Sequence, residues 1–351
     1  MGGLGDVARQ GGLVAAALLA RRARLRRDDA GYGRHVAAAL RLAAPELAAA
    51  LPEAGPGEIR LVEPIGHTRG GFFSALASAG RGADLFVKAV PSRGREARFW
   101  AAWARGEIRS RGAHYLLAPP LAECRGTLVT ILAFARDDAL PATRGQAFRR
   151  FRTGLDAVVR AVADFNSDHM GRDWPLPPAG FGRVCRVPRR RDVCRELGIE
   201  PQGADALVAT MQATAARWGG VAAALDAAPG CLCHLDLGTG NVVATGESCA
   251  IIDFGMAAPA PAGADLHTIL RYGGRGLGAA EGLVAEYVAV FAAKGIALDP
   301  EAVLRACRAH YATRYTNLRL RSVSRREVFE AAVAAGASLV EETERARRLH
   351  R

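Results

Sequence analysis

The chain has 351 residues, half of them hydrophobic, and a formal net charge of +12. This length and apolar content predict a globular protein with a substantial core, leave room for two lobes and exclude a disordered chain. The positive charge comes from 45 Arg and only two Lys, Lys88 and Lys294. Because no nucleic-acid-binding motif accompanies this arginine bias, we attribute it to GC-rich coding and expect no nucleic-acid partner.

The seven cysteines do not have the pattern of a disulfide framework. Their odd number and the lack of a leader-like segment predict a reducing environment, the cytoplasm. Cys231 and Cys233 precede His234 and resemble metal ligands, but no second cluster with ligand spacing accompanies them. We therefore expect buried thiols at these two positions.

Residues 1–57 are rich in Ala and Leu and predict an N-terminal helical extension, interrupted at Asp28–Gly33. The apolar run Gly11–Ala20 is ten residues long, and a membrane span needs about twenty. The basic stretch Arg21–Arg27 follows this run and is typical of the solvated end of an amphipathic helix. Peripheral contact of this basic helix with a membrane surface is the alternative.

Residues 58–138 predict a small β-rich lobe. Short apolar runs alternate with glycine-rich turns, a pattern typical of an antiparallel sheet. We expect a sheet of about five strands interrupted by one helix over residues 94–108. The expected strands are residues 59–66, 72–78, 85–90, 116–124 and 127–135.

Residues 139–351 predict a larger helical lobe. Their periodicity is helical, with long helices expected over residues 147–166 and 204–225. A β-hairpin over residues 242–252, turning at Gly246, interrupts the helices. The sequence as a whole therefore predicts an α+β fold with a β-rich lobe and a helical lobe.

Two short motifs in the second half carry the functional signal. The stretch CHLDLGTGN contains His234, Asp236 and Asn241, and the stretch IIDFG contains Asp253 and Gly255. The chain has only three asparagines. An asparagine at the spacing H-x-D-x-x-x-x-N from His234 and Asp236 would therefore seldom occur by chance. The hairpin expected between the two motifs would bring the side chains of Asn241 and Asp253 together.

The order of these features is a glycine-rich hairpin, a strand lysine, a helix glutamate, H-x-D-x-x-x-x-N and D-F-G. It resembles the protein-kinase-like fold, and more closely its aminoglycoside phosphotransferase and choline kinase branch. The resemblance covers roughly residues 58–335. It implies a bilobal fold, with residues 58–138 as a nucleotide-binding N-lobe and residues 139–351 as a C-lobe for catalysis and acceptor binding. It also implies the cofactors ATP and Mg²⁺, and transfer of a phosphate to the hydroxyl of a small molecule.

The motif residues suit phosphoryl transfer, which depends mostly on positioning and charge neutralisation. Asp236 suits the carboxylate that orients the acceptor hydroxyl and takes its proton. Asn241 and Asp253 supply the oxygen ligands that Mg²⁺ prefers. The resemblance implies that His234 supports the loop without being the base. It also implies that Asp265, in the stretch G-A-D-L, is a structural cap.

Lys88 lies mid-strand between apolar neighbours, where an ammonium group is costly unless it meets an anion. We expect it to bind the phosphates of ATP, and a solvent-facing lysine on an edge strand is the alternative. Glu96, eight residues further on, should orient Lys88. Glu107 is its rival, because an uninterrupted helix would place it three turns along on the same face.

The loop GHTRGG precedes the second expected strand. We expect it to cover the phosphates with backbone N–H groups. It lacks the G-x-G-x-x-G spacing, so an ordinary hairpin turn is the alternative. The glycines assigned to nucleotide binding are Gly66, Gly70 and Gly71.

The stretch after D-F-G reaches Asp265 within twelve residues of Asp253 and contains no A-P-E motif. This leaves little room for a peptide-docking platform, so a protein kinase is a weaker alternative. The helical stretch Arg305–Glu327 contains seven Arg, which predicts an acceptor with negative charge and weak or no turnover of polycationic aminoglycosides. A solvated helix face is the alternative for these arginines, and a nucleotide-binding scaffold without turnover is the alternative function.

Overall fold

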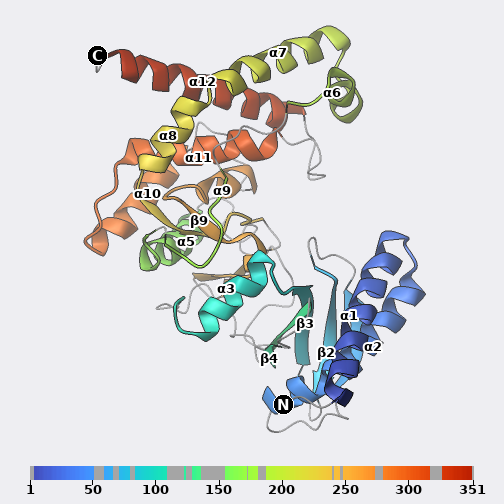
Figure 1. The fold of residues 1–351 in the computed structure, drawn as a ribbon. Helices are drawn as coiled ribbons and strands as arrows, with labels where there is room; N and C mark the ends of the chain where they lie inside the picture. Colours follow the sequence, from blue (N-terminus) through green and yellow to red (C-terminus); the bar gives the residue numbers. More distant parts are fainter. Residues whose placement is uncertain are drawn as a thin grey trace. The chain divides into compact units, whose positions relative to one another are not determined.

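The structure of the chain is a computed structural model. It describes residues 4–50, 59–65, 71–79, 84–108, 122–123, 129–135, 155–171, 173–180, 187–238, 241–245, 248–272, 280–316 and 326–349. The chain forms two compact units (Figure 1). The first contains Met1–Ala142 and Ile252–Ala257, and the second contains Thr143–Ile251 and Ala258–Arg351. Helices and antiparallel strands make up both units, so the predicted α+β class is confirmed.

The first unit is built on a five-stranded antiparallel sheet with the order β1-β2-β3-β5-β4. The third strand in sequence is central, with β2 and β5 as its neighbours. Residues 87–90 of this strand are all buried, as expected for a strand that has a neighbour on each side. The strands are β1 (Ile59–Ile65), β2 (Phe73–Ala79), β3 (Asp84–Pro91), β4 (Ala122–Glu123) and β5 (Val129–Ala135).

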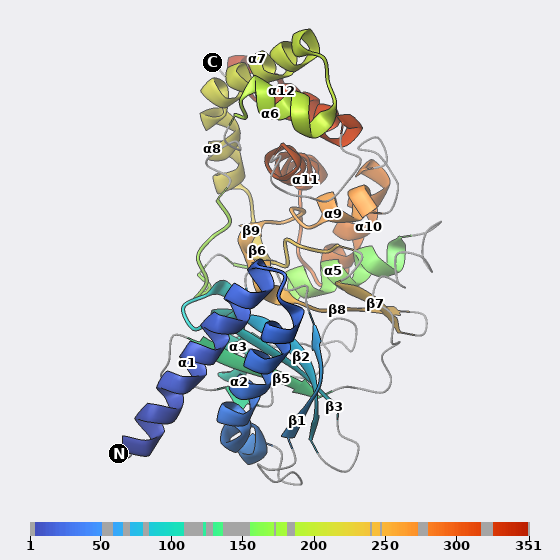
Figure 2. The same ribbon diagram turned by 90° about the vertical axis from the view of Figure 1, so that its right-hand side faces the viewer.

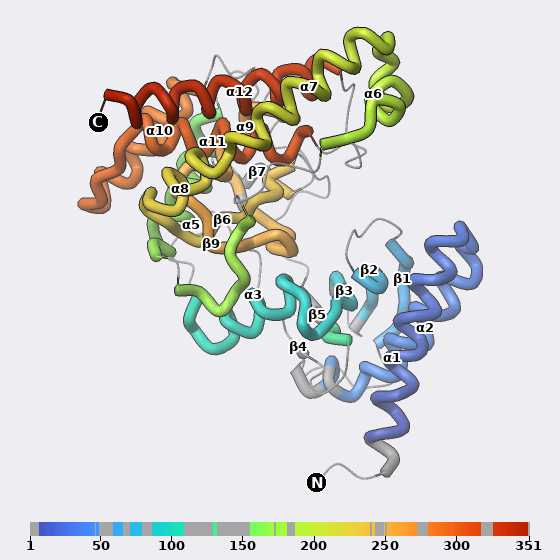
Figure 3. The backbone as a smooth tube through the Cα atoms, turned by 45° about the horizontal axis from the view of Figure 1, so that its top comes forward, coloured from blue at the N-terminus to red at the C-terminus, as the bar shows by residue number. Residues whose placement is uncertain are grey.

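Two N-terminal helices, α1 (Leu4–Leu25) and α2 (Asp29–Ala50), pack against each other and against this sheet (Figure 3). Buried Leu and Ala side chains of both helices share one hydrophobic core with the strands. The hydroxyl of Tyr32 on α2 donates to the carbonyl of Ile65 at 2.9 Å, which fixes α2 to the end of β1. The helical segment expected over residues 1–57 therefore lies in the same unit as the sheet.

Helix α3 (Arg95–Ala104) follows β3 directly and is shorter than expected. Gly106 takes a left-handed conformation with φ 73° just beyond its end, which stops the helix. The helix packs against η2 (Phe254–Met256), a single turn that contains the phenylalanine and glycine of D-F-G. The rings of Phe99 and Phe254 stack with centroids 4.4 Å apart and hold this turn against α3.

The second unit is mostly helical (Figure 2). The helix expected over residues 204–225 is in fact two helices that meet at Trp218, and the prediction of one helix was wrong. Two glycines follow this buried tryptophan and weaken a continuous helix. The helices are α5 (Asp156–Asp168), α6 (Arg190–Leu197), α7 (Pro201–Arg217), α8 (Gly219–Ala227), α9 (Leu266–Tyr272), α10 (Ala280–Ala293), α11 (Pro300–Tyr315) and α12 (Arg326–Leu349).

Two short strand pairs complete the second unit. The expected hairpin is formed by β7 (Val242–Thr245) and β8 (Ser248–Ile251). Strand β6 (Gly230–Cys233) pairs with β9 (Ala258–Pro261) and is buried along its whole length. The loop that contains His234 and Asp236 starts where β6 ends, so this buried strand fixes the beginning of the loop. No helix in the described part of the chain is both long and apolar enough to cross a membrane.

Candidate active site

Lys88 lies in the central strand β3 and is only 4% exposed. Its ammonium lies 2.8 Å from Oε1 of Glu96, in the first turn of α3, and 2.9 Å from Oδ1 of Asp253. The structure thus places Glu96 beside the lysine. Glu107 lies beyond the end of α3 and instead pairs with the neighbouring Arg105 at 2.6 Å.

The protonation of this cluster follows from burial and from two negative charges. Burial acts to lower the pKa of Lys88, but the carboxylates of Glu96 and Asp253 outweigh it, and the pKa is raised. Burial raises the pKa of Glu96, against the effect of the Lys88 ammonium. Because two carboxylates share one ammonium, a divalent cation at Asp253 would be electrostatically favourable.

Gly255 gives the cluster the space it needs. A Cβ atom at this position would lie 3.2 Å from Oε2 of Glu96 and 3.3 Å from Oδ1 of Asp253. The left-handed backbone turn of this motif does not lie at Gly255, which has no positive φ. Instead, Asp253 itself takes the left-handed conformation, with φ 66°. A non-glycine residue held there costs about 1 kcal/mol or more, so the surrounding contacts must stabilise it.

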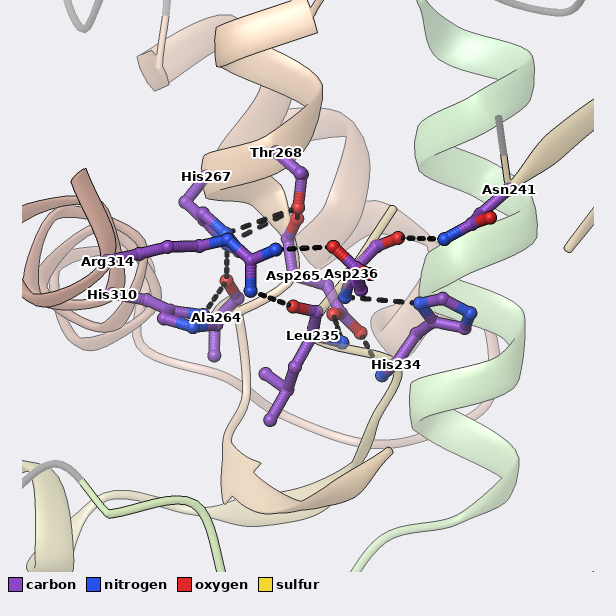
Figure 4. Close-up of polar contacts among 10 residues, drawn as sticks. All are labelled: His234, Leu235, Asp236, Asn241, Ala264, Asp265, His267, Thr268, His310 and Arg314. Carbon is purple, nitrogen blue, oxygen red and sulfur yellow. Dashed lines mark hydrogen bonds and ion pairs between the residues drawn. The ribbon is translucent and has the colours of Figure 1, made fainter. Parts of the chain in front are cut away.

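The loop after β6 is held from inside the second unit by Asp265 (Figure 4). Its buried carboxylate accepts the backbone N–H of His234 at 2.9 Å and that of Leu235 at 2.6 Å. Leu235 has a left-handed backbone, with φ 61°, and these two bonds stabilise it. Asp265 thus steadies the loop by binding its backbone.

Asp265 is in turn fixed by a buried polar network. The amide nitrogen of Asn166 on α5 donates to Oδ2 of Asp265 at 3.1 Å and to the carbonyl of Leu232 at 2.8 Å. The hydroxyl of Tyr287 on α10 donates to Oδ1 of Asn166 at 2.9 Å. Such fully bonded buried groups are rigid. Helices α5 and α10 and strand β6 therefore position the carboxylate that holds the loop.

His234 and Asp236 occupy different environments. His234 is fully buried, and its Nδ1 accepts the backbone N–H of Asp236 at 3.2 Å, which leaves the ring proton on Nε2. The side chain of Asp236 is 37% exposed, and one of its carboxylate oxygens, Oδ1, forms an ion pair with Arg314. This arrangement is consistent with a supporting histidine and an accessible carboxylate.

Asn241 and Asp253, the expected Mg²⁺ ligands, lie one in each unit. The amide nitrogen of Asn241 donates to the carbonyl of Asp236 at 2.7 Å, so its Oδ1 is the atom left for a cation. A carboxylate and an amide oxygen are donors that suit Mg²⁺, which usually retains water and phosphate oxygens as further ligands. Among the described residues, no three His, Cys, Asp or Glu side chains form a metal site on their own.

The remaining sequence predictions concern glycines and cysteines. Gly66 and Gly70 lie outside the described residues, and Gly71 is buried just before β2. Cys231 and Cys233 are fully buried, and their sulfur atoms lie 3.5 Å apart. Burial raises the pKa of Cys233, so it is a buried thiol, as expected.

Sequence reasoning did not identify Asn166, Tyr287 or Arg314 as part of the site. Asn166 offered a weak signal, because it is one of only three asparagines and lies on a helix with apolar neighbours. Arg314 offered none, because it is one of seven arginines in one stretch. Only the packing of α11 beside the loop distinguishes it from the others.

Comparison with protein families gives an independent result. Residues 155–306 match the model of the family described as "Phosphotransferase enzyme family". This span begins at α5, ends within α11 and includes both sequence motifs, H-x-D-x-x-x-x-N and D-F-G. The predicted resemblance is confirmed. The match also confirms the predicted enzyme class, a phosphotransferase.

Three solved structures are similar to the chain. An aminoglycoside phosphotransferase from Alicyclobacillus acidocaldarius is 18% identical, with 81% of this chain and 93% of that chain covered and a TM-score of 0.47. A choline/ethanolamine kinase family protein from Mesorhizobium loti is 18% identical, with 88% and 97% covered and a TM-score of 0.45. The choline kinase LicA from Streptococcus pneumoniae is 12% identical, with 80% and 94% covered and a TM-score of 0.47. Among curated proteins, no sequence matches the chain.

Proposed function

We propose that the chain is an ATP- and Mg²⁺-dependent phosphotransferase that moves the γ-phosphate to a hydroxyl of a small molecule. The buried Lys88, held by Glu96 and Asp253, is the observation that carries this proposal. An ammonium on a central strand, oriented by two acids, is suited to bind phosphate oxygens. The family match over residues 155–306 supports the same reaction class.

Each residue of the first unit's cluster has a distinct task. Lys88 binds phosphate oxygens of ATP, and Glu96 keeps the ammonium in place from α3. Asp253 binds Mg²⁺ through its carboxylate, with the amide oxygen of Asn241 as the second protein ligand. The cation, when bound, neutralises charge on the phosphates.

Asp236 acts as the base in this proposal. Its Oδ1 is paired with Arg314, so Oδ2 is the oxygen that accepts the hydrogen bond of the acceptor hydroxyl. The hydroxyl oxygen attacks the γ-phosphorus, the bond to the β,γ-bridging oxygen breaks, and the hydroxyl proton moves to Asp236. His234 keeps the loop in place through the N–H of Asp236.

The acceptor is proposed to be a hydroxylated small molecule that carries negative charge. Arg314 contacts the carboxylate of Asp236, so an acceptor hydroxyl bound there lies beside a guanidinium group. Because the carboxylate of Asp236 offsets the charge of Arg314, the preference depends on the excess of arginine over acidic residues in the stretch Arg305–Glu327, which would attract a phosphate or carboxylate of the acceptor and repel an ammonium group. This supports the expectation that aminoglycosides are poor acceptors.

The proposal is tested by the Asp236→Asn variant. We expect it to bind Mg-ATP as the unmodified chain does in calorimetry but to lose phosphate transfer in an acceptor screen that measures ADP release. The matched control is Asp205→Asn, which removes an exposed carboxylate paired with Arg190. If the unmodified chain binds Mg-ATP but no acceptor in the screen increases ADP release, the result contradicts the proposed enzyme. It would instead support the alternative function, a nucleotide-binding scaffold without turnover.

The acceptor charge is tested by pairs of compounds that differ in one phosphate or carboxylate, such as a free sugar and its phosphate ester. We expect a higher kcat/KM for the charged member of each pair. Rapid phosphorylation of kanamycin-class compounds would contradict the proposed charge preference while leaving the reaction class intact. Labelled proteins in a lysate would instead support a protein kinase.

A further inference from the structure

Arg314 is the last arginine of α11 and contacts the loop that contains the proposed base (Figure 4). Its Nη1 donates to the carbonyl of Leu235 at 2.9 Å, and its Nη2 pairs with Oδ1 of Asp236. The side chain is only 18% exposed. One guanidinium group therefore binds the backbone and the side chain of two consecutive loop residues.

The loop has a specific need for these two bonds. Leu235 has a left-handed backbone conformation, and Asp265 binds only the N–H side of the loop. The carbonyl of Leu235 and the carboxylate of Asp236 are acceptors, and Arg314 binds both of them. A planar guanidinium offers two parallel donors at a fixed spacing, which a lysine ammonium does not.

We propose that Arg314 is a positioning residue that fixes the rotamer of Asp236 and so directs Oδ2 to the acceptor hydroxyl. The inference rests on the proposed function of Asp236 as the base. Holding Oδ1 removes rotation about the side-chain bonds of Asp236, and a base must lie within hydrogen-bond reach of the proton it takes. Arg314 itself touches neither the hydroxyl nor the phosphate in this mechanism.

The same helix contains a matched control. Arg308 also lies on α11 and forms a two-pronged ion pair with Glu342 of α12, at 3.0 and 3.1 Å. It resembles Arg314 in helix and charge but contacts no residue of the loop in any hydrogen bond described for it. If Arg314 served only to stabilise the fold, substitutions at both positions would have the same kind of effect.

The experiment measures kcat and KM for ATP, with ADP release to water as acceptor so that no acceptor need be known. For Arg314→Ala we expect kcat to fall about 100-fold, with KM for ATP and the melting temperature close to those of the unmodified chain. Added guanidinium ion, far below unfolding concentrations, should restore at least part of kcat. Arg308→Ala should keep its kcat and should not respond to guanidinium.

Arg314→Lys serves as a second variant in case the alanine variant does not fold. A lysine can reach only one of the two acceptors, so we expect an intermediate kcat with an unchanged KM for ATP. An unchanged kcat in both the lysine and the alanine variant would overturn the inference. A loss of kcat that guanidinium does not restore, and that accompanies a lower melting temperature, would overturn it as well. Failure of the proposed function is separate, because Asp236→Asn would then leave ADP release unchanged.

Discussion

The ammonium nitrogen of Lys88 lies 2.8 Å from Oε1 of Glu96, although the two residues belong to a strand and to the helix after it. The link between β3 and α3 is short, so residue 96 falls in the first turn of the helix. Asp253, which is 165 residues away from Lys88 in sequence, completes the cluster at 2.9 Å. The lysine is therefore oriented by one local partner and one distant partner.

The first prediction concerns the choice between Glu96 and Glu107. We expect Glu96→Gln to reduce kcat/KM for ATP by about tenfold to 100-fold, because the neutral amide orients the Lys88 ammonium less strongly. Glu107→Gln is the matched control, since its exposed carboxylate pairs only with Arg105 among the ion pairs described for it. Steady-state kinetics with varied ATP measures both. Equal effects of the two substitutions would contradict the assignment.

The second prediction concerns Gly255. We expect Gly255→Ala to lower activity more than stability, because its Cβ would push against the carboxylates of both Glu96 and Asp253. Gly219→Ala is a control without close neighbours, since nothing lies within 4 Å of a Cβ there. Mg-ATP affinity and the melting temperature measure the two effects. A variant with normal Mg-ATP affinity would show that the cluster tolerates a wider separation.

The third prediction concerns the stacked pair His267 and His310, whose ring centroids lie 3.8 Å apart. Each Nδ1 donates to the carbonyl of Ala264, at 2.6 and 3.0 Å, so Nδ1 carries a proton in both rings (Figure 4). Burial and the nearby Arg314 charge lower the pKa of His310 to about 3, and burial lowers that of His267.

The unfolded chain takes up protons at these two positions below pH about 6.5, whereas the folded chain does not. The free energy of unfolding should therefore fall as the pH decreases below 6.5, with a slope that approaches about 1.4 kcal/mol per pH unit for each histidine. Urea unfolding between pH 7 and pH 5 measures this slope. In the His310→Asn variant, which keeps an amide donor for Ala264, the slope should be smaller by one histidine's share. An unchanged slope would contradict the neutral buried pair.

The fourth prediction concerns Gly263, which precedes Asp265 and has φ 94°. A Cβ atom there would lie 2.6 Å from the carbonyl oxygen of Val303, so Gly263→Ala should destabilise the chain by about 3 kcal/mol or more. In Gly282→Ala, on α10, the Cβ meets nothing within 4 Å, and the substitution should stabilise by about 0.5–1 kcal/mol. Chemical denaturation measures both, and opposite signs are the expected outcome.

Much of the first unit could be predicted because its signals are local. Strand alternation and glycine-rich turns predicted the five-stranded sheet, and the rarity of lysine made Lys88 conspicuous. Lys294, the other lysine, also lies against carboxylates, those of Asp164 and Asp168. Glu107 was an alternative partner for Lys88 only if the helix continued as far as residue 107. That premise was wrong, because α3 ends at Ala104 and Gly106 has a left-handed backbone, with φ 73°.

The sequence by itself determined which residues are candidates for the site, because H-x-D-x-x-x-x-N and D-F-G are linear patterns that can be read without coordinates. Only the tertiary structure decided which residues support them. Asn166 binds strand β6 at Leu232, 66 residues away in sequence, and Arg314 binds the loop at Leu235, 79 residues away. Their contacts depend on how the helices pack around the loop, and packing between distant elements leaves no periodic trace in the sequence.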